Sequence, residues 1–121
     1  MFDYSRDYHL FITHEEKDPH VLPQLIPQWD HSPRTGGGGN IYIKSTPKYF
    51  YQHAIEALEV VRNKPESEQI IMLKSWNEWA EGNYMEPDLK YGKGFIQALR
   101  KALDEYCSAA NNVTTNRNIK F

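Results

Sequence analysis

Short apolar runs along the chain alternate with longer stretches whose apolar residues recur at helical spacing. The runs at residues 21–27 and 70–76 are short, rich in valine, isoleucine and leucine, and followed by polar segments, which is typical of buried strands. Prolines bound the first run, as is tolerated near strand ends. A third, shorter extended piece is expected at residues 41–44.

Two longer stretches are predicted to be helices. The first begins at Pro47, with the hydroxyl of Ser45 or Thr46 as its N-cap, and ends near Asn63. The second covers residues 91–106. The residues that recur on one face of these helices, and that we expect in the core, are Phe50, Ala54, Leu58 and Val61 in the first and Phe95, Ile96, Leu99, Leu103 and Tyr106 in the second.

The strand–loop–helix order therefore occurs twice, which predicts an α/β fold with parallel pairing of the two strands. Residues 21–107 carry these elements. Residues 1–20 are aromatic and charged, without a pattern that distinguishes helix from strand, and residues 108–121 are a polar tail expected to fray. The polar segments 29–34 and 76–86 should lie at the C-terminal edge of the strands, where α/β proteins carry their active sites.

The composition limits the classes of partner. With 121 residues, of which 40% are hydrophobic and 25% charged, the chain is long enough for one small domain. A net charge of −2 gives no indication of binding to nucleic acid or to an anionic membrane. No apolar run is long enough to cross a bilayer, and the first residues lack the order of a signal peptide. A cytoplasmic location is therefore expected.

Neither a metal nor a cofactor is expected. Cys107 is the only cysteine, which excludes an internal disulfide and a cysteine-based zinc site, and the five histidines have no ligand spacing. The four glycines at 36–39 lack the GxGxxG and Walker patterns. They predict a flexible connector, with phosphate binding as the alternative.

The stretch SWNEWAEGNYMEPD, residues 75–88, contains the candidate chemistry. It places the carboxylates of Glu78, Glu81 and Glu86 among tryptophan, asparagine and tyrosine side chains. Aromatic rings can stack on the apolar faces of a pyranose, while carboxylates and amides bind hydroxyls or transfer protons. This pattern indicates a site that handles sugars.

The spacing of Glu78 and Glu81 leaves two interpretations open. In a continuing strand, residues three apart face opposite ways, so both enter one site only if the strand ends near Asn77 and the chain turns. Gly82 is placed to permit that turn. Otherwise both glutamates are solvated loop charges.

The other polar and aromatic residues near the two strand ends also have alternative, purely structural interpretations. Trp76 and Trp79 are either site residues or buried core side chains beside a strand end. Asp30 and Arg34 are either site residues or an ion pair on the surface, which would contribute little stability.

Several strings resemble one protein family. WNEWAEGNYMEPD, followed by KYGKGFIQAL, resembles the C-terminal signature of the WbsX-like family, whose members are glycosyltransferases or lipopolysaccharide-biosynthesis proteins and are similar to glycoside hydrolase family 99. PQWDHSPR and STPKYF resemble segments that precede this signature in the same family. The resemblance covers roughly residues 22–103.

The resemblance implies a (β/α)8 TIM barrel and a pair of catalytic glutamates. Glu78 would act as the base toward the sugar 2-hydroxyl, and Glu81 as the acid that protonates the leaving oxygen, with retention through a 1,2-anhydro sugar. Polysaccharide or oligosaccharide would be the substrate, and whether it is transferred or hydrolysed, as by an endo-mannosidase, is left open. The implied substrate-binding residues are Trp29, Asp30, Arg34, Asn77, Trp79, Tyr84 and Glu86.

Two departures from the family pattern affect these expectations. The glycines at 36–39 replace a more basic stretch, and the chain offers about two strand–helix units where a barrel needs about 250 residues. We therefore expect a partial barrel, its C-terminal strand–helix units only, which begins at a truncated start. Such a piece should be inactive alone and prone to self-association through open strand edges.

Two other hypotheses remain open at this point. The chain is either a non-catalytic carbohydrate-binding or assembly module that uses its tryptophans without turnover, or a nonfunctional gene remnant. Replacement of Glu81 by glutamine distinguishes catalysis from binding.

Overall fold

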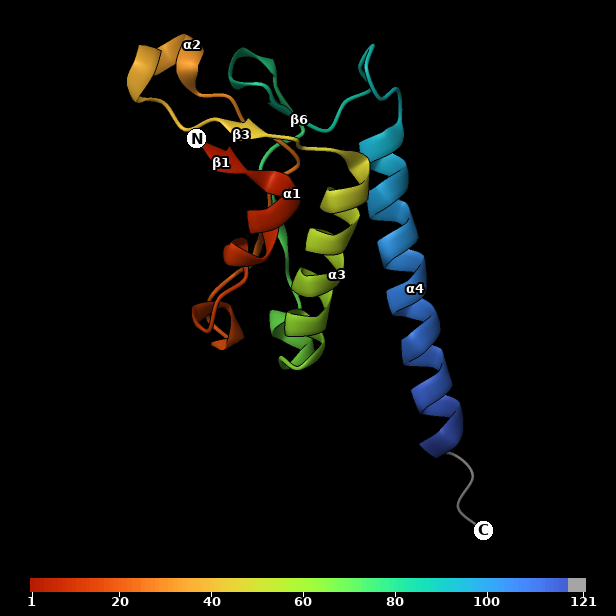
Figure 1. The fold of residues 1–121 in the computed structure, drawn as a ribbon. Helices are drawn as coiled ribbons and strands as arrows, with labels where there is room; N and C mark the ends of the chain where they lie inside the picture. Colours follow the sequence, from red (N-terminus) through yellow and green to blue (C-terminus); the bar gives the residue numbers. More distant parts are fainter. Residues whose placement is uncertain (118–121) are drawn as a thin grey trace.

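Two long helices, α3 (Pro47–Arg62) and α4 (Gly94–Arg117), lie side by side and run in the same direction (Figure 1). They dominate the computed structural model, which describes the backbone of residues 1–117 and the side chains of residues 1–109. The loops that enter both helices lie at one end of the molecule, together with the short helix α2 (Ser32–Thr35) and the strand β6 (Asn83–Tyr84).

Helix α3 begins as its sequence predicts. Thr46, the N-cap, accepts a hydrogen bond from the Tyr49 amide at 3.4 Å, and Pro47 occupies the first helical position, where no amide hydrogen is needed. The amide of Asn63 caps the far end. The apolar stripe predicted for this helix is confirmed, because each of its members is at most 5% exposed: Phe50, Ala54, Leu58 and Val61.

Helix α4 meets α3 through small residues, which corrects part of the prediction. Phe95 is buried as expected and packs edge-on against Phe50, with ring centroids 5.6 Å apart. Ala98 and Ala102 are buried beside it, because small side chains let two helices approach closely. The predicted residues Ile96, Leu99 and Tyr106 are partly buried and pack against this core, whereas Leu103 is 40% exposed. Predicted to end near Tyr106, the helix continues to Arg117; residues 118–121 lie outside the described part.

The two predicted strands pair in parallel, as the sequence predicts. Strand β2 (Gln24–Leu25) lies beside β4 (Met72–Leu73), with Leu25 opposite Leu73. Main-chain bonds extend the pairing on both sides, from Met72 N to Pro23 O at 2.9 Å and from Lys74 N to Leu25 O at 2.8 Å. The regular part of β2 is only two residues long because the prolines at 23 and 27 have no amide hydrogen to donate.

The N-terminal residues, for which the sequence predicted no element, cover one edge of β2. Strand β1 (Phe2–Asp3) pairs in parallel with β3 (Tyr42–Ile43), and α1 (Tyr4–Asp7) follows it. The buried hydroxyl of Tyr4 donates to Ile26 O at 2.7 Å, and the Ile26 amide donates to Nε2 of His53 at 3.4 Å. Side chains of the N-terminal segment and of α3 therefore satisfy the main-chain groups of Ile26, just beyond β2.

One face of the β2–β4 pair is uncovered. Leu22, Ile70, Met72 and Trp76 are between 38% and 50% exposed, while the alternate residues of both strands pack toward α3 and α4. The described residues form three two-stranded sheets and no closed barrel. Membership of a TIM barrel and self-association through this face stay predictions.

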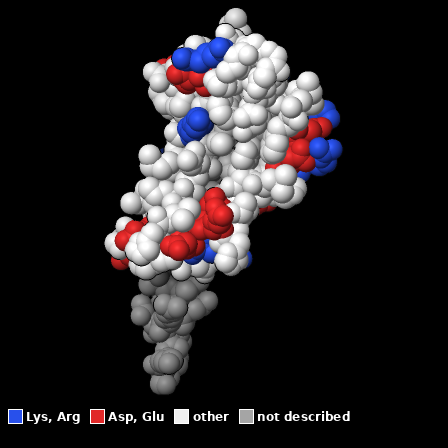
Figure 2. Space-filling model, turned by 90° about the vertical axis from the view of Figure 1, so that its left-hand side faces the viewer, with Lys and Arg blue, Asp and Glu red and all other residues white. Residues whose placement is uncertain are grey.

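The remaining elements are short turns and a hairpin. They are η1 (Tyr8–Phe11), η2 (Glu15–Lys17), η3 (Gly36–Gly38), η4 (Glu66–Glu68), β5 (Asn77–Glu78) and η5 (Trp79–Glu81). In the described residues, neither long helix has the length of apolar sequence that a bilayer crossing requires. Acidic and basic residues form small mixed groups on the face drawn in Figure 2, which presents no continuous basic surface.

Candidate functional site

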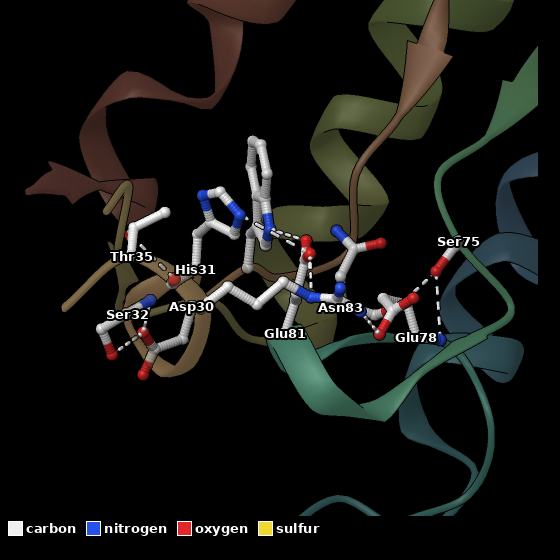
Figure 3. A network of polar contacts seen from close by, with 10 residues as sticks. Asp30, His31, Ser32, Thr35, Ser75, Glu78, Glu81 and Asn83 are labelled. Carbon is white, nitrogen blue, oxygen red and sulfur yellow. Dashed lines mark hydrogen bonds and ion pairs between the residues drawn. The ribbon is translucent and has the colours of Figure 1, made fainter. Parts of the chain in front are cut away.

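The two polar segments predicted to meet do lie together, at the C-terminal ends of β2 and β4. The Asp30 amide donates to Glu81 O at 2.7 Å, and Asn83 Nδ2 donates to Gln28 O at 2.7 Å. These bonds join parts of the chain that are more than fifty residues apart in sequence. Figure 3 shows the resulting polar network, with Asp30 and His31 on one side and Glu78, Glu81 and Asn83 on the other.

A tight turn brings both glutamates to this network. Strand β5 ends at Glu78, η5 reverses the chain, and β6 returns antiparallel, with Glu78 opposite Asn83. Gly82 makes the return possible because it adopts a left-handed conformation, φ 55° and ψ 22°, that side chains with a Cβ rarely adopt. This is the turn that the spacing of the glutamates required.

Glu81 is held by donors from the other segment. Its Oε2 accepts from Trp29 Nε1 at 2.9 Å, and its Oε1 lies 2.6 Å from Arg34 Nε and 3.6 Å from His31 Nε2. The side chain is 15% exposed. Since both carboxylate oxygens have partners, the interpretation of Glu81 as a solvated loop charge is wrong.

Arg34 joins the two carboxylates. Its NH2 lies 3.4 Å from Glu78 Oε1 while its Nε contacts Glu81, so one guanidinium bridges both groups. The Glu78 side chain is 41% exposed and has fewer contacts than that of Glu81. Both glutamates thus enter one site, but in different surroundings.

Asp30 shapes the segment instead of pairing with Arg34. Its Oδ1 accepts from the Ser32 amide at 3.0 Å and from the Ser32 hydroxyl at 2.5 Å (Figure 3). These bonds, the hydroxyl first, lower the pKa of the Asp30 carboxyl. The alternative of a surface pair between Asp30 and Arg34 is wrong, because Arg34 is engaged by the two glutamates.

Three further residues belong to the network and were not singled out from the sequence. Ser75 donates to Asn83 O at 2.6 Å and accepts from the Glu78 amide at 3.2 Å, which fixes the start of the hairpin. Asn83 is 1% exposed. His31 flanks Glu81. A serine or histidine in a polar loop carries no signal of this kind, since the contacts arise only when the two segments meet.

The remaining predicted site residues lie on the hairpin, away from the Arg34 bridge. Trp79 stacks on Tyr84 with ring centroids 3.7 Å apart and an interplanar angle of 14°. Its Nε1 donates to Glu86 Oε2 at 2.5 Å. Asn77 is exposed and lies opposite Tyr84 in the hairpin ladder. Trp79 is 48% exposed and Trp76 is 49% exposed, so neither is a buried core side chain.

The glycine run follows α2 as a 3₁₀ turn, with residues 36–38 exposed. Gly39 is constrained, because a Cβ there would lie 2.5 Å from Thr35 Oγ1 and 2.9 Å from the Ser32 nitrogen. Among the residues that the structure describes, no group of three histidine, cysteine or acidic side chains is placed to hold a metal ion. The chemistry available here is that of carboxylates, a guanidinium and aromatic rings.

Comparisons with known proteins give one family model and two curated relatives. The family model described as "Glycosyltransferase WbsX" matches residues 1–99. Two curated proteins, both described as "Uncharacterized protein WxcX" and both from strains of Xanthomonas campestris pv. campestris, are 31% identical over 98 residues, which is 80% of this chain. The chain spans about 14% of the length of these relatives. No solved structure matches it.

Proposed function

The chain belongs to the WbsX family of glycosyltransferases, and from that premise we propose that it acts on polysaccharide, with Glu78 and Glu81 as the acid–base pair at a glycosidic bond. The observation that carries this proposal is the Arg34 bridge, which contacts Glu81 at 2.6 Å and Glu78 at 3.4 Å. It gathers two carboxylates from one hairpin into a single site beside the indole of Trp29.

The unequal surroundings of the two carboxylates support a division of roles. Glu81 is 15% exposed with both oxygens bound, and Glu78 is 41% exposed. Paired carboxylates take different roles when their environments differ. Glu78, the more accessible group, takes the proton of the sugar 2-hydroxyl, whose oxygen then attacks C1. Glu81 gives its proton to the leaving oxygen.

Arg34 has to move for this chemistry to proceed. Its Nε contacts Oε1 of Glu81, and Trp29 Nε1 donates to Oε2. Neither carboxyl oxygen of Glu81 is therefore free to carry a transferable proton. The Arg34 side chain is 54% exposed, so an entering sugar can displace it. Trp29 then remains as the group that orients Glu81.

Glycan turnover tests the proposal, measured with the purified chain or, where that chain is inactive alone, with a longer protein that includes it. We expect E78Q and E81Q each to lower turnover at least about a hundredfold, the usual size of a general acid–base contribution. R34K, which keeps the charge but not the planar fork, should have a smaller effect. W76F is the matched control, because Trp76 is half exposed and is not part of the bridge. Unchanged turnover in E81Q would contradict the assignment.

A second candidate function is carbohydrate binding without turnover. The full engagement of Glu81 by Trp29 and Arg34 favours it, since a carboxylate held in this way acts as an acceptor. In that case the chain binds glycan, shows no turnover, and E81Q weakens binding only through loss of the Arg34 contact.

A further inference from the structure

The hairpin β5–η5–β6 has a second face that the carboxylate pair does not use. Neighbouring residues of a strand point to opposite faces, so Tyr84 faces away from its neighbour Asn83. The Asn83 side chain points toward Gln28, which places it on the side of the Arg34 bridge. Tyr84 therefore lies on the other face of the hairpin, opposite Asn77, with its hydroxyl near the side chains of Gln28 and Asp88.

An aromatic stack occupies this face. The indole of Trp79 lies nearly parallel to the Tyr84 ring, 14° from coplanar, at a centroid distance of 3.7 Å. Trp79 nevertheless keeps 48% of its surface exposed. One side of the indole is covered by tyrosine, and the exposed remainder is a flat apolar surface of the size on which one sugar ring can stack.

Glu86 fixes the orientation of this surface. Its Oε2 accepts the Trp79 indole hydrogen at 2.5 Å, a short, charge-assisted bond. The stack and this bond together hold the indole, which has only two side-chain torsions. A half-exposed tryptophan with its ring plane set in advance loses little conformational entropy when a ligand stacks on it.

We propose that the Trp79–Tyr84 stack, oriented by Glu86, is a binding platform for a neutral pyranose unit, separate from the Glu78–Glu81 pair. This proposal rests on the proposed function in one respect, namely that the ligand is a carbohydrate. Glu86 is here a positioning residue, not a sugar ligand. A polysaccharide contacts the hairpin on both faces, so the chain recognises more than one sugar unit.

The preference for a neutral sugar follows from the charges around the platform. Glu86 contacts the indole, and Asp88 lies close enough to Tyr84 that its charge, after burial, contributes to raising the pKa of the tyrosine hydroxyl. Two carboxylates beside the stack repel a uronic acid. Lys90 also contributes at Tyr84, but with a smaller effect than Asp88.

Binding of mannotetraose, a neutral tetrasaccharide, to the 121-residue chain tests the platform. Calorimetry gives the affinity, and the three indole N–H signals in a nitrogen-15 spectrum locate the contact. We expect the Trp79 signal to shift, W79A to weaken binding by about tenfold, and W76A to leave it unchanged. Trp76 is the matched control because it is equally exposed, at 49%, and no ring stacks on it within the described part.

Substitutions at Glu86 separate positioning from direct contact. E86Q keeps an oxygen that accepts from the indole and should bind as the unaltered chain does, whereas E86A should bind more weakly. Equal effects of W79A and W76A, a Trp79 signal that does not move, or tighter binding of tetragalacturonate would each overturn the proposal. Turnover in E78Q and E81Q bears on the acid–base pair alone, so failure of either proposal is recognised independently.

Discussion

The indole N–H of Trp29 donates to Oε2 of Glu81 at 2.9 Å, across a sequence separation of 52 residues. This bond ties the segment after β2 to the hairpin after β4, and it leaves the opposite oxygen of Glu81 to Arg34. The two strand ends therefore depend on each other: the β2 segment orients a glutamate that the β4 segment supplies.

The first prediction concerns this bond. W29F keeps a ring under Lys74, whose Nζ lies 4.2 Å from the Trp29 centroid, but removes the donor. The chain should lose about 1.5–3 kcal/mol of unfolding free energy, the range for a hydrogen bond to a charged group. Urea unfolding measures the loss, with W76F as control, for which less than about 0.5 kcal/mol is expected. Equal losses would show that the bond adds nothing.

Local features of the fold were predictable from the sequence, because their causes are local. The N-cap hydroxyl and Pro47 start α3, and the stripe from Phe50 to Val61 sets its buried face. In α4 the same reasoning predicted Leu103 in the core, whereas Ala102 is the buried residue. Spacing gives the period of an apolar face, but it does not show which of two neighbouring residues lies in a close helix–helix contact.

The site was predictable only in part, for the same reason. Glu78, Glu81 and the turn at Gly82 follow from spacing and from the conformational freedom of glycine. The partners of Glu81 do not, because Trp29 and Arg34 reach it only once β2 and β4 pair. A tertiary contact of this kind leaves no mark in the order of residues.

The second prediction concerns Gly82. A Cβ there would meet Asp30 atoms at 3.6–3.7 Å, an ordinary contact, so the cost of G82A is that of the left-handed backbone, about 1 kcal/mol. G82N should cost less, because asparagine tolerates this conformation. Gly37, where a Cβ meets nothing within 4 Å, is the control, and G37A should be neutral in thermal unfolding. A neutral G82A would mean that the turn tolerates a Cβ.

The third prediction is a loss of stability in mild acid that depends on His53. Burial lowers the pKa of this fully buried imidazole from 6.5 to about 4, and its Nε2 accepts from the Ile26 amide only when neutral. Below pH 6.5 His53 is protonated in the unfolded chain, whereas in the folded chain it stays neutral down to about pH 4. Stability therefore falls over this interval, by about 3 kcal/mol if the other groups are unaffected.

Urea unfolding at pH 7 and pH 4.5 measures this loss, and the contribution of His53 is the difference from H53M. Methionine fills a similar volume and does not titrate, so H53M should start less stable at pH 7 but lose less on acidification. The same loss in both proteins would assign the acid sensitivity to other groups.

The fourth prediction concerns the uncovered face of β2 and β4, where Met72 is 50% exposed and Ile70 is 46% exposed. Apolar strand surface of this kind associates when no other layer covers it. Sedimentation velocity should therefore show association that increases with protein concentration, and M72K should reduce it by placing a charge in the face. Leu89 is fully exposed elsewhere, so L89K is the matched control and should change nothing. A chain that stays monomeric at all concentrations, or one that responds equally to both substitutions, would show that this face does not drive association.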